Sequence, residues 1–511
     1  MAYNSLEFLF VFLPILLIAY QKTKQKYRWI VLLLANYIFF FSWSKALVLY
    51  QIAGVIMTYY FGRELTGIGK APENMDKKVF HTKKHHVLVL GVLCNLALLV
   101  ALKYGSSIID NISLLFSGTD TIIKILVPIG ISYYTLQNIS YLVDISSKKI
   151  KACDNIFKLA LYSSFFVTIL EGPITRYGEI EADLTAGHDI TPDHFVQGIE
   201  RMTWGVFQKM VIADHLNVAV NVLFRSYTQY GSLCLLAAIL CTIQLYMDFA
   251  GTIDIAIGTA KVFNITVAEN FRQPFFAKNA SDFWHRWHIT LGTFLRDYVF
   301  YPISLSKPIQ HMTQKLRKSH HRLLARYLGP SIALLAVWLA NGFWHGPHWI
   351  YVVYGLYYFV FMIIEMLWEK PFEKWCNGHH LPVNGWIIRT FRFLKLSLIV
   401  VIGEMVFRAL ETSTAVTMVR SIFTNFHIAD LVKYFPKLGI SNNYWIILSA
   451  CFAIVIVKDV LKEKKFPMRE KFENLPKYLR WGLYYGLIFA IIFFGAYGSG
   501  YDAVAMMYAG F

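Results

Sequence analysis

Two histidines lie where an imidazole could act on a substrate. His345 belongs to the run Asn341-Gly-Phe-Trp-His-Gly-Pro-His348, which lies between two long apolar segments. The glycine and proline directly after it predict the end of a helix at this point. Imidazole has the ordinary pKa nearest to neutral pH, and an ionisable group within a membrane segment usually marks a function. His345 is therefore our first candidate for a general base.

The second histidine, His288, closes the run Asp282-Phe-Trp-His-Arg-Trp-His288. We expect one helix that begins near Ser281, which can cap it, with an apolar stripe along one face. The residues of that stripe are Trp284, Trp287, Leu291, Leu295 and Tyr298. His288, Thr293, Arg296 and Asp297 fall on the opposite face, which we expect to line a cavity. The pair Arg296 and Asp297 suits a buried structural ion pair equally well.

Structural roles compete with the functional ones for the other members of these runs. His285 and His348 suit caps on backbone carbonyls or positions among lipid headgroups better than catalysis. Trp284, Trp287 and Trp344 suit packing or interface anchoring better than contact with a substrate. The chemistry therefore depends mainly on His345 and His288.

The composition predicts the elements that position these side chains. Hydrophobic residues make up 56% of the 511 residues and charged residues only 16%, and the mean hydropathy is +0.45. Apolar stretches long enough to cross a bilayer recur along the whole chain, which favours one all-α membrane domain over residues 1–511. The six cysteines are scattered without a CxxC pair, so neither a disulfide framework nor a metal site is indicated.

The apolar runs predict roughly eleven membrane spans with additional re-entrant or interfacial helices. A helical hairpin is expected over 29–61, with an interruption at 42–45, and a broken segment over 122–145 because of Pro128 and Gly130. The mixed segment 195–224 suits an interfacial or bundle-lining helix. The remaining spans are expected at 6–20, 87–104, 155–170, 233–249, 328–343, 349–368, 390–410, 444–457 and 481–497.

The positive charges set the expected orientation. The net charge of +17 lies in short runs between apolar segments, the pattern of the positive-inside rule and of contact with anionic lipids, not of nucleic-acid binding. The loops at 63–86 and 458–480 should be cytoplasmic and the N-terminus extracytoplasmic, in the cell membrane. The first run lacks a basic region before it and a cleavage site after it, so we expect a retained helix and no cleaved signal peptide.

Five stretches resemble a known family. They are LVPIGISYYTLQNISYLVD (126–144), EGPITRY (171–177), QLYMDFAGTIDIAIG (244–258), ENFRQPFFAKNASDFWHRWHITLGTFLRDYVFYPI (269–303) and NGFWHGPHWIYVVYGLYY (341–358). In this order, within a core at about 126–365, they resemble the membrane-bound O-acyltransferases. The bacterial branch is the most similar, with the alginate O-acetylation protein, the peptidoglycan O-acetyltransferase and the D-alanyl transfer protein of teichoic acid synthesis. The opening FLFVFLPI and the final MYAGF also look like the ends of that family.

The resemblance implies a funnel-shaped helical bundle with a tunnel, in which His345 is catalytic and His288 is the second active-site histidine. It also implies a tunnel lining that includes Trp344, Trp287, Arg296, Asp297, Asn270, Gln273 and Asp248. Four positions depart from the family pattern, Thr252, Ile253, Glu171 and Asn341, and they leave the acceptor open.

The chemistry agrees with this reading. A thioester is already activated, whereas a hydroxyl is a poor nucleophile until a base takes its proton. The expected donor is acetyl-CoA or an acyl-carrier thioester in the cytoplasm. The expected acceptor is a cell-envelope polysaccharide or an extracytoplasmic acetyltransferase-type partner protein. Two alternatives stay open: D-alanyl transfer to teichoic acid, or a transporter of an acylated or glycan intermediate that uses the histidines as proton relays.

Overall fold

Helices account for all the regular structure that we describe. A computed structural model describes residues 1–68, 77–117 and 125–497, and within these ranges it contains helices and no strands. A bilayer offers no hydrogen-bond partners to the backbone, so a spanning segment must satisfy its own N–H and C=O groups, as a helix does. The prediction of an all-α, multi-pass membrane protein is confirmed.

Six described segments are long and apolar enough to cross a membrane. Every one of them overlaps an apolar run that the sequence marks as a span. The expected total of roughly eleven spans stays a prediction. The six segments are Gln25–Gly67, Thr82–Lys103, Gly231–Val262, Arg322–His345, Trp349–Gly378 and Asn442–Glu463.

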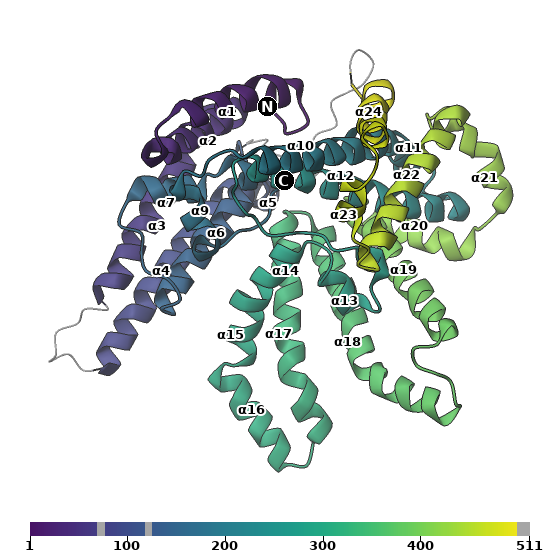
Figure 1. The fold of residues 1–511 in the computed structure, drawn as a ribbon. Coiled ribbons are helices and arrows are strands. Elements are labelled where there is room, and N and C mark those ends of the chain that lie inside the picture. The colour runs from purple at the N-terminus through teal and green to yellow at the C-terminus, as the bar shows by residue number, and fades with distance from the viewer. Residues whose placement is uncertain (69–76, 118–124, 498–511) are drawn as a thin grey trace. The chain divides into compact units, whose positions relative to one another are not determined.

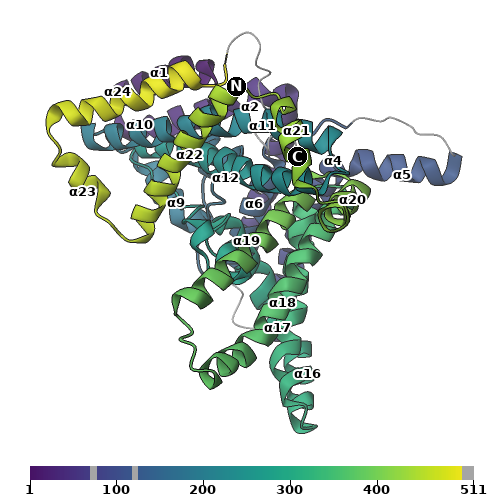
Figure 2. The same ribbon diagram turned by 90° about the vertical axis from the view of Figure 1, so that its right-hand side faces the viewer.

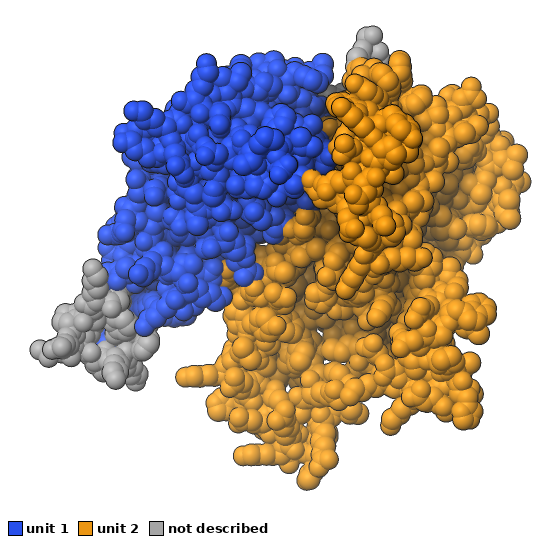
Figure 3. Space-filling view, in the orientation of Figure 1, with its two compact units in different colours: residues 1–202, 252–268, 505–511 blue, residues 203–251, 269–504 orange. Residues whose placement is uncertain are grey.

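The chain forms two compact units (Figure 3). Among the described residues, unit 1 comprises 1–202 and 252–268, and unit 2 comprises 203–251 and 269–497. The residues 69–76 of the expected cytoplasmic loop and the motif MYAGF at the end of the chain lie outside the described residues. The expectation of one functional domain over 1–511 stays a prediction.

Unit 1 is built around α3, α4 and α6, which pack against one another (Figure 1). Arg28, at the start of α2, binds the loop that follows α9. Its Nη1 donates to the Gly187 carbonyl at 3.0 Å and to Asp189 Oδ1 at 2.6 Å. The helices of this unit are α1 (Leu13–Lys22), α2 (Arg28–Ser44), α3 (Val48–Ile68), α4 (Lys77–Lys103), α5 (Gly105–Ser117), α6 (Ile131–Ser146), α7 (Ile156–Ser163), α8 (Phe166–Ile169), α9 (Tyr177–Ala186) and most of α10 (Pro192–Val206).

Two expected interruptions in unit 1 are confirmed. The segment 29–61 breaks at Lys45, which has a φ of 44° between α2 and α3. The packing of its two halves as a hairpin stays a prediction. The segment before α6 is not helical, and Gly130 caps that helix with a φ of 71°. A Cβ at Gly130 would clash with the carbonyl oxygen of Ile169, so this turn requires glycine for space as well as for conformation.

The span expected over 155–170 is wrong. The segment divides into α7 and α8, which have 8 and 4 residues and are too short to cross a bilayer. Asn36 on α2 explains the break: its Nδ2 donates to the Leu161 carbonyl at 3.1 Å and its Oδ1 accepts from the Phe166 N–H at 3.0 Å. This side chain satisfies the end of one helix and the start of the next, so a continuous helix is not needed there.

Unit 2 contains the histidine-bearing runs. The mixed segment over 195–224 is helical, as α10 and α11 joined by a π-helical turn at Phe207–Ala213, and its interfacial or bundle-lining role stays a prediction. The helices of this unit are α11 (Asp214–Ser226), most of α12 (Gly231–Val262), α13 (Ala280–Trp284), α14 (Ile289–Leu295), α15 (Tyr301–Ser304), α16 (Lys307–Lys318), α17 (Arg322–His345), α18 (Trp349–Gly378), α19 (Trp386–Arg408), α20 (Thr412–Thr424), α21 (Ile428–Tyr434), α22 (Asn442–Glu463), α23 (Met468–Glu473) and α24 (Lys477–Phe494).

The expected orientation can be tested at the two ends of α22. In a chain without its native cysteines, Ala429→Cys precedes this span and Glu470→Cys follows it in the loop 458–480, and both positions are exposed. We expect a membrane-impermeant maleimide to label Ala429→Cys in intact cells and Glu470→Cys only after permeabilisation, because cationic loops stay in the cytoplasm. Labelling of Glu470→Cys in intact cells would place the loop 458–480 outside the cell and contradict the expected orientation.

Candidate active site

A tight helical hairpin presents His345. α17 ends at His345 and α18 begins three residues after the following glycine, and the two helices run side by side in both ribbon views (Figures 1 and 2). A Cβ at Gly342 would lie 2.6 Å from the carbonyl oxygen of Tyr351, and a Cβ at Gly355 would clash with that of Trp338. The two glycines therefore allow the close helix contact that places His345 inside unit 2.

The His345 ring is enclosed by aromatic side chains. The residue is buried, and its ring centroid lies 4.9 Å from that of Trp344 and 5.0 Å from that of Phe407. Tyr351 and Tyr354 lie slightly further away, at 6.0 and 6.1 Å. Such an enclosure excludes bulk water and strengthens electrostatic interactions with any reacting group.

His288 lies at a break between helices, so the prediction of one helix from Ser281 is wrong. α13 ends at Trp284, and α14 begins only at Ile289. The cap of α13 is also Asn279, not Ser281, since its side chain accepts from the Asp282 N–H at 2.8 Å. His288 has a φ of 45°, a left-handed conformation that is uncommon outside glycine and collects at functional sites.

The cause of this break is a contact with a preceding segment of the chain. The Ile289 N–H donates to the Asn270 carbonyl at 3.0 Å, and the Arg272 N–H donates to the Arg286 carbonyl at 2.9 Å. The Asn270 side-chain oxygen lies 3.2 Å from His288 Nδ1. These bonds replace the helical ones and fix His288 in the interior. Burial lowers the pKa of His288 well below its ordinary value, which keeps the ring neutral.

The two histidines meet at one indole ring. The Trp344 ring centroid lies 5.6 Å from that of His288 and 4.9 Å from that of His345. Phe249 closes the other side of His288, with its ring edge-on at 4.9 Å. Two runs that are more than fifty residues apart in the sequence thus form one centre in unit 2.

A cavity of about 1390 Å³ in unit 2 reaches this centre. His288 lines it, together with Asn341, which lies one helical turn before His345 on α17. Trp284 and Trp338 form an apolar wall, with their ring centroids 5.0 Å apart. The cavity also contains five cationic side chains, Arg272, Arg296, Arg326, Lys370 and Lys462. Four carboxylates line it as well, Glu269, Asp282, Glu365 and Glu369, so the cavity combines an apolar surface with charges of both signs.

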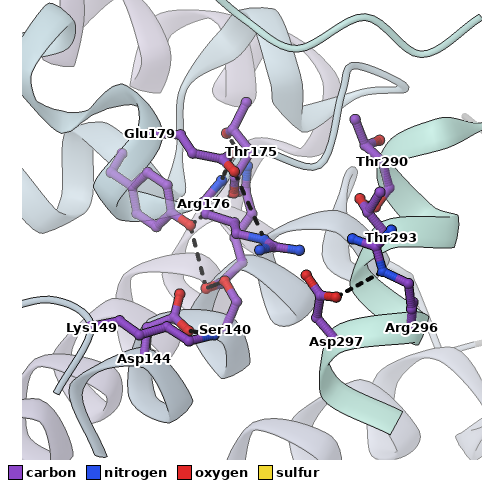
Figure 4. A network of polar contacts seen from close by, with 12 residues as sticks. Ser140, Asp144, Lys149, Thr175, Arg176, Glu179, Thr290, Thr293, Arg296 and Asp297 are labelled. Carbon is purple, nitrogen blue, oxygen red and sulfur yellow. Dashed lines mark hydrogen bonds and ion pairs between the residues drawn. The ribbon is translucent and has the colours of Figure 1, made fainter. Parts of the chain in front are cut away.

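Two of the expected lining residues border this cavity. Gln273 does so from a left-handed turn with a φ of 40°, and Arg296 does so from the π-helical turn Arg296–Phe300. Arg296 Nε donates to Asp297 Oδ1 at 2.9 Å, a half-exposed ion pair at the end of the row Thr290, Thr293, Arg296 and Asp297 (Figure 4).

The other five expected lining residues do not line this cavity: Trp344, Trp287, Asp297, Asn270 and Asp248. Trp287 is buried and stacks on Phe283 at a centroid distance of 5.5 Å. Asn270 is fully buried beneath His288. Asp248 lies 3.0 Å from the ammonium of the buried Lys209, which also contacts Asp214 Oδ1 at 2.5 Å. Burial raises the pKa of Asp214 to about 7; the Lys209 ammonium opposes this shift and the Asp248 carboxylate adds to it.

Sequence reasoning missed a buried carboxylate beside the aromatic enclosure. Glu404 Oε1 on α19 accepts from the hydroxyls of Tyr354 and Tyr358, at 3.1 and 3.2 Å. The sequence did contain a signal: Glu404 is the one carboxylate in the apolar run 390–410, and an acid within a membrane segment usually marks a function. No group of three potential metal ligands lies together in the residues that we describe.

The matched runs divide between the units. The segments 126–144 and 171–177 belong to unit 1, where Gln137 Nε2 donates to Thr175 Oγ1 at 3.1 Å. Glu179 Oε2 then accepts from the backbone N–H of Arg176 at 3.2 Å at the start of α9 (Figure 4). The segments 269–303 and 341–358 belong to unit 2 and supply the histidine centre, which is therefore complete within one unit.

Comparison with known proteins gives one consistent result. Residues 146–315 match the model of the membrane-bound O-acyltransferase family. A probable alginate O-acetylase of Pseudomonas syringae is 30% identical over 399 residues, which cover 76% of this chain and 72% of the relative. A peptidoglycan O-acetyltransferase of Helicobacter pylori is 26% identical over 77% of this chain and 76% of the relative. A teichoic acid D-alanyltransferase of Bacillus subtilis is 29% identical over 54% of this chain and 69% of the relative.

Proposed function

The chain belongs to the membrane-bound O-acyltransferase family, and from this premise we propose that it transfers an acetyl group from cytoplasmic acetyl-CoA to a hydroxyl of the cell envelope. His345 acts as the general base and His288 supports it. The observation that carries this proposal is the pair of buried histidines that contact the same Trp344 ring at a cavity. The transporter alternative lacks comparable support, since the named relatives are acyltransferases.

The reaction balances without a metal or redox group. The acceptor hydroxyl gives its proton to the His345 imidazole as its oxygen attacks the thioester carbonyl carbon. The new C–O bond forms and the C–S bond breaks. The proton then passes from the imidazolium to the departing thiolate, so the products are an ester and a free thiol. A base within the aromatic enclosure serves this step because water is excluded from the reactive thioester.

The cavity of unit 2 suits the donor in charge and shape. Acetyl-CoA carries phosphates at one end and a thin pantetheine arm that ends in the thioester. Arg272, Arg326, Lys370 and Lys462 offer cations to the phosphates, and the wall of Trp284 and Trp338 suits the arm. Two of the carboxylates in the lining form ion pairs, Asp282 with Arg286 and Glu365 with Lys395. These pairs reduce the electrostatic repulsion between the lining and the phosphates of the donor.

The relatives favour acetyl over D-alanyl as the group transferred. The two acetyl-transferring relatives align with 76% and 77% of this chain, whereas the D-alanyltransferase of Bacillus subtilis aligns with 54%. Their names give alginate, peptidoglycan and teichoic acid as acceptors. We propose an envelope polysaccharide as the final acceptor, reached directly or through an ester on an extracytoplasmic partner protein.

Reconstituted vesicles can test the donor. We expect radiolabelled acetyl-CoA, presented with an envelope fraction, to yield free thiol and alkali-labile ester in equal amounts, because every transfer releases one thiol and forms one ester. His345→Ala vesicles provide the blank. Ester formation from a D-alanyl carrier-protein thioester and none from acetyl-CoA would overturn the acetyl assignment and leave an acyltransferase. Equal turnover in the blank would contradict the proposed base.

A further inference from the structure

The side chain of Asn270 determines which nitrogen of His288 carries the proton. We propose that Asn270 is a positioning residue that holds His288 as the Nδ1–H tautomer, so that Nε2 is the basic nitrogen of this ring. The inference rests on the proposed function, because it assigns a role in acyl transfer to His288. Asn270 does not line the cavity and is fully buried, so it acts through the histidine and not on a substrate.

The orientation of the Asn270 amide follows from its contacts. The backbone N–H of Thr290 lies 3.1 Å from the atom assigned as Oδ1 and can only donate, so that atom must be the oxygen. The Thr290 hydroxyl donates to the same oxygen at 2.9 Å. The amide nitrogen of Asn270 has no hydrogen-bond partner among the described residues, so no contact at that end favours the reversed orientation. The oxygen therefore faces His288.

An acceptor at this position requires a donor on the histidine. His288 Nδ1 lies 3.2 Å from the Asn270 oxygen, and two acceptors in contact would repel each other, so Nδ1 must carry a hydrogen. Burial keeps the ring neutral, and a neutral imidazole has one N–H. That proton is on Nδ1, and Nε2 carries the lone pair. Free imidazole exchanges between the two forms, whereas this contact selects one.

The main chain fixes the same arrangement. The Asn270 carbonyl accepts from the Ile289 N–H at 3.0 Å, directly after the left-handed turn at His288. One residue thus holds both the backbone and the ring of His288 with two different groups. In the opposite tautomer Nε2 would bear a hydrogen and could not take a proton from a substrate or from a polarised hydroxyl. Asn270 thereby determines whether His288 can support His345.

The test combines tautomer and turnover in the full-length protein in lipid. Histidine labelled with ¹⁵N distinguishes protonated from bare ring nitrogens, and subtraction of the His288→Gln spectrum isolates the His288 signals. We expect Nδ1–H in the parent. Asn270→Ala should give a mixed or reversed tautomer and a kcat lower by about 10–100-fold, the usual cost of losing a partner that orients a functional histidine. The KM for acetyl-CoA should hardly change.

Two variants serve as matched controls. Asn270→Asp keeps an oxygen that accepts from the same donors, so it should keep Nδ1–H and recover most of the transfer that Asn270→Ala loses. Thr290→Val removes one donor to the same oxygen but leaves the backbone N–H, so it should keep the tautomer and lower transfer less than about threefold. A purely structural role would not separate these variants by tautomer.

The failures of the two proposals are distinguishable. Nε2–H in the parent protein would overturn the positioning role, even if Asn270→Ala did not fold. A reversed tautomer in Asn270→Ala with full transfer would overturn it as well. His288→Ala should leave weak but measurable transfer. Full activity in His288→Ala would instead contradict the role of His288 in the proposed function.

Discussion

His345→Ala is expected to lower acyl transfer by about 10²–10⁴-fold, the range over which a positioned general base contributes to a rate. The residue ends α17 within an enclosure of aromatic rings, and the other described histidine at this centre is His288. The thioester needs no further activation, so loss of the base affects the hydroxyl directly. The measurement is ester formation in reconstituted vesicles, normalised to the amount of folded protein.

Two substitutions separate proton transfer from packing. His345→Gln keeps a hydrogen-bonding side chain but cannot take the proton, so it should be nearly as inactive as His345→Ala. His348→Ala serves as the matched control, because His348 is exposed just before α18. This substitution should lower acyl transfer far less than His345→Ala. Retention of more than about half of the transfer by His345→Ala would be incompatible with general-base catalysis of this size.

Lys209→Met is expected to destabilise the protein by roughly 3–5 kcal/mol, because it leaves buried carboxylates without their counter-ion. Lys209 is fully buried and contacts both Asp214 and Asp248, at 2.5 and 3.0 Å. Methionine has a similar volume, so the loss is mainly electrostatic. The measurement is the midpoint of thermal unfolding in detergent, which should fall by several degrees relative to the parent.

Asp214→Asn is the matched control for this cluster. The substitution leaves Lys209 paired with Asp248 alone, one positive charge with one negative charge, and removes a carboxyl whose pKa burial has raised. We expect a much smaller loss of stability than in Lys209→Met. A loss as large as that of Lys209→Met would mean that shape, not charge balance, holds this cluster together.

Local patterns in the chain were enough for most of the helical architecture. Hydrophobic runs of sufficient length marked all six segments among the described residues that can span a membrane, because a span depends on the composition of consecutive residues. The breaks at Lys45 and before Gly130 were likewise visible in neighbouring residues. The end of α17 at His345 followed from Gly346 and Pro347. Proline has no backbone N–H to donate to the preceding turn, so a glycine followed by a proline favours the end of a helix.

The errors arose where a distant residue supplies hydrogen bonds. Asn36 satisfies backbone groups near Ser164 and divides an expected span. Asn270 likewise accepts from the backbone N–H groups of Ile289 and Thr290 and interrupts the helix expected from Ser281. In both segments the apolar period alone favoured a continuous helix. A periodic pattern reports which face is buried, but it contains no information about a buried amide that arrives from another part of the chain.

Motifs identified His345 and His288 as candidates, but not the way in which they are held. The indole between the two rings, the acceptor beneath His288 Nδ1 and the cluster of Lys209 with Asp214 and Asp248 all join segments that are separated along the chain. Side-chain identity sets what chemistry is available, because it sets which groups can donate or accept a proton. Which nitrogen is basic, and which carboxylate is neutralised, depends on partners that only folding brings within hydrogen-bond distance.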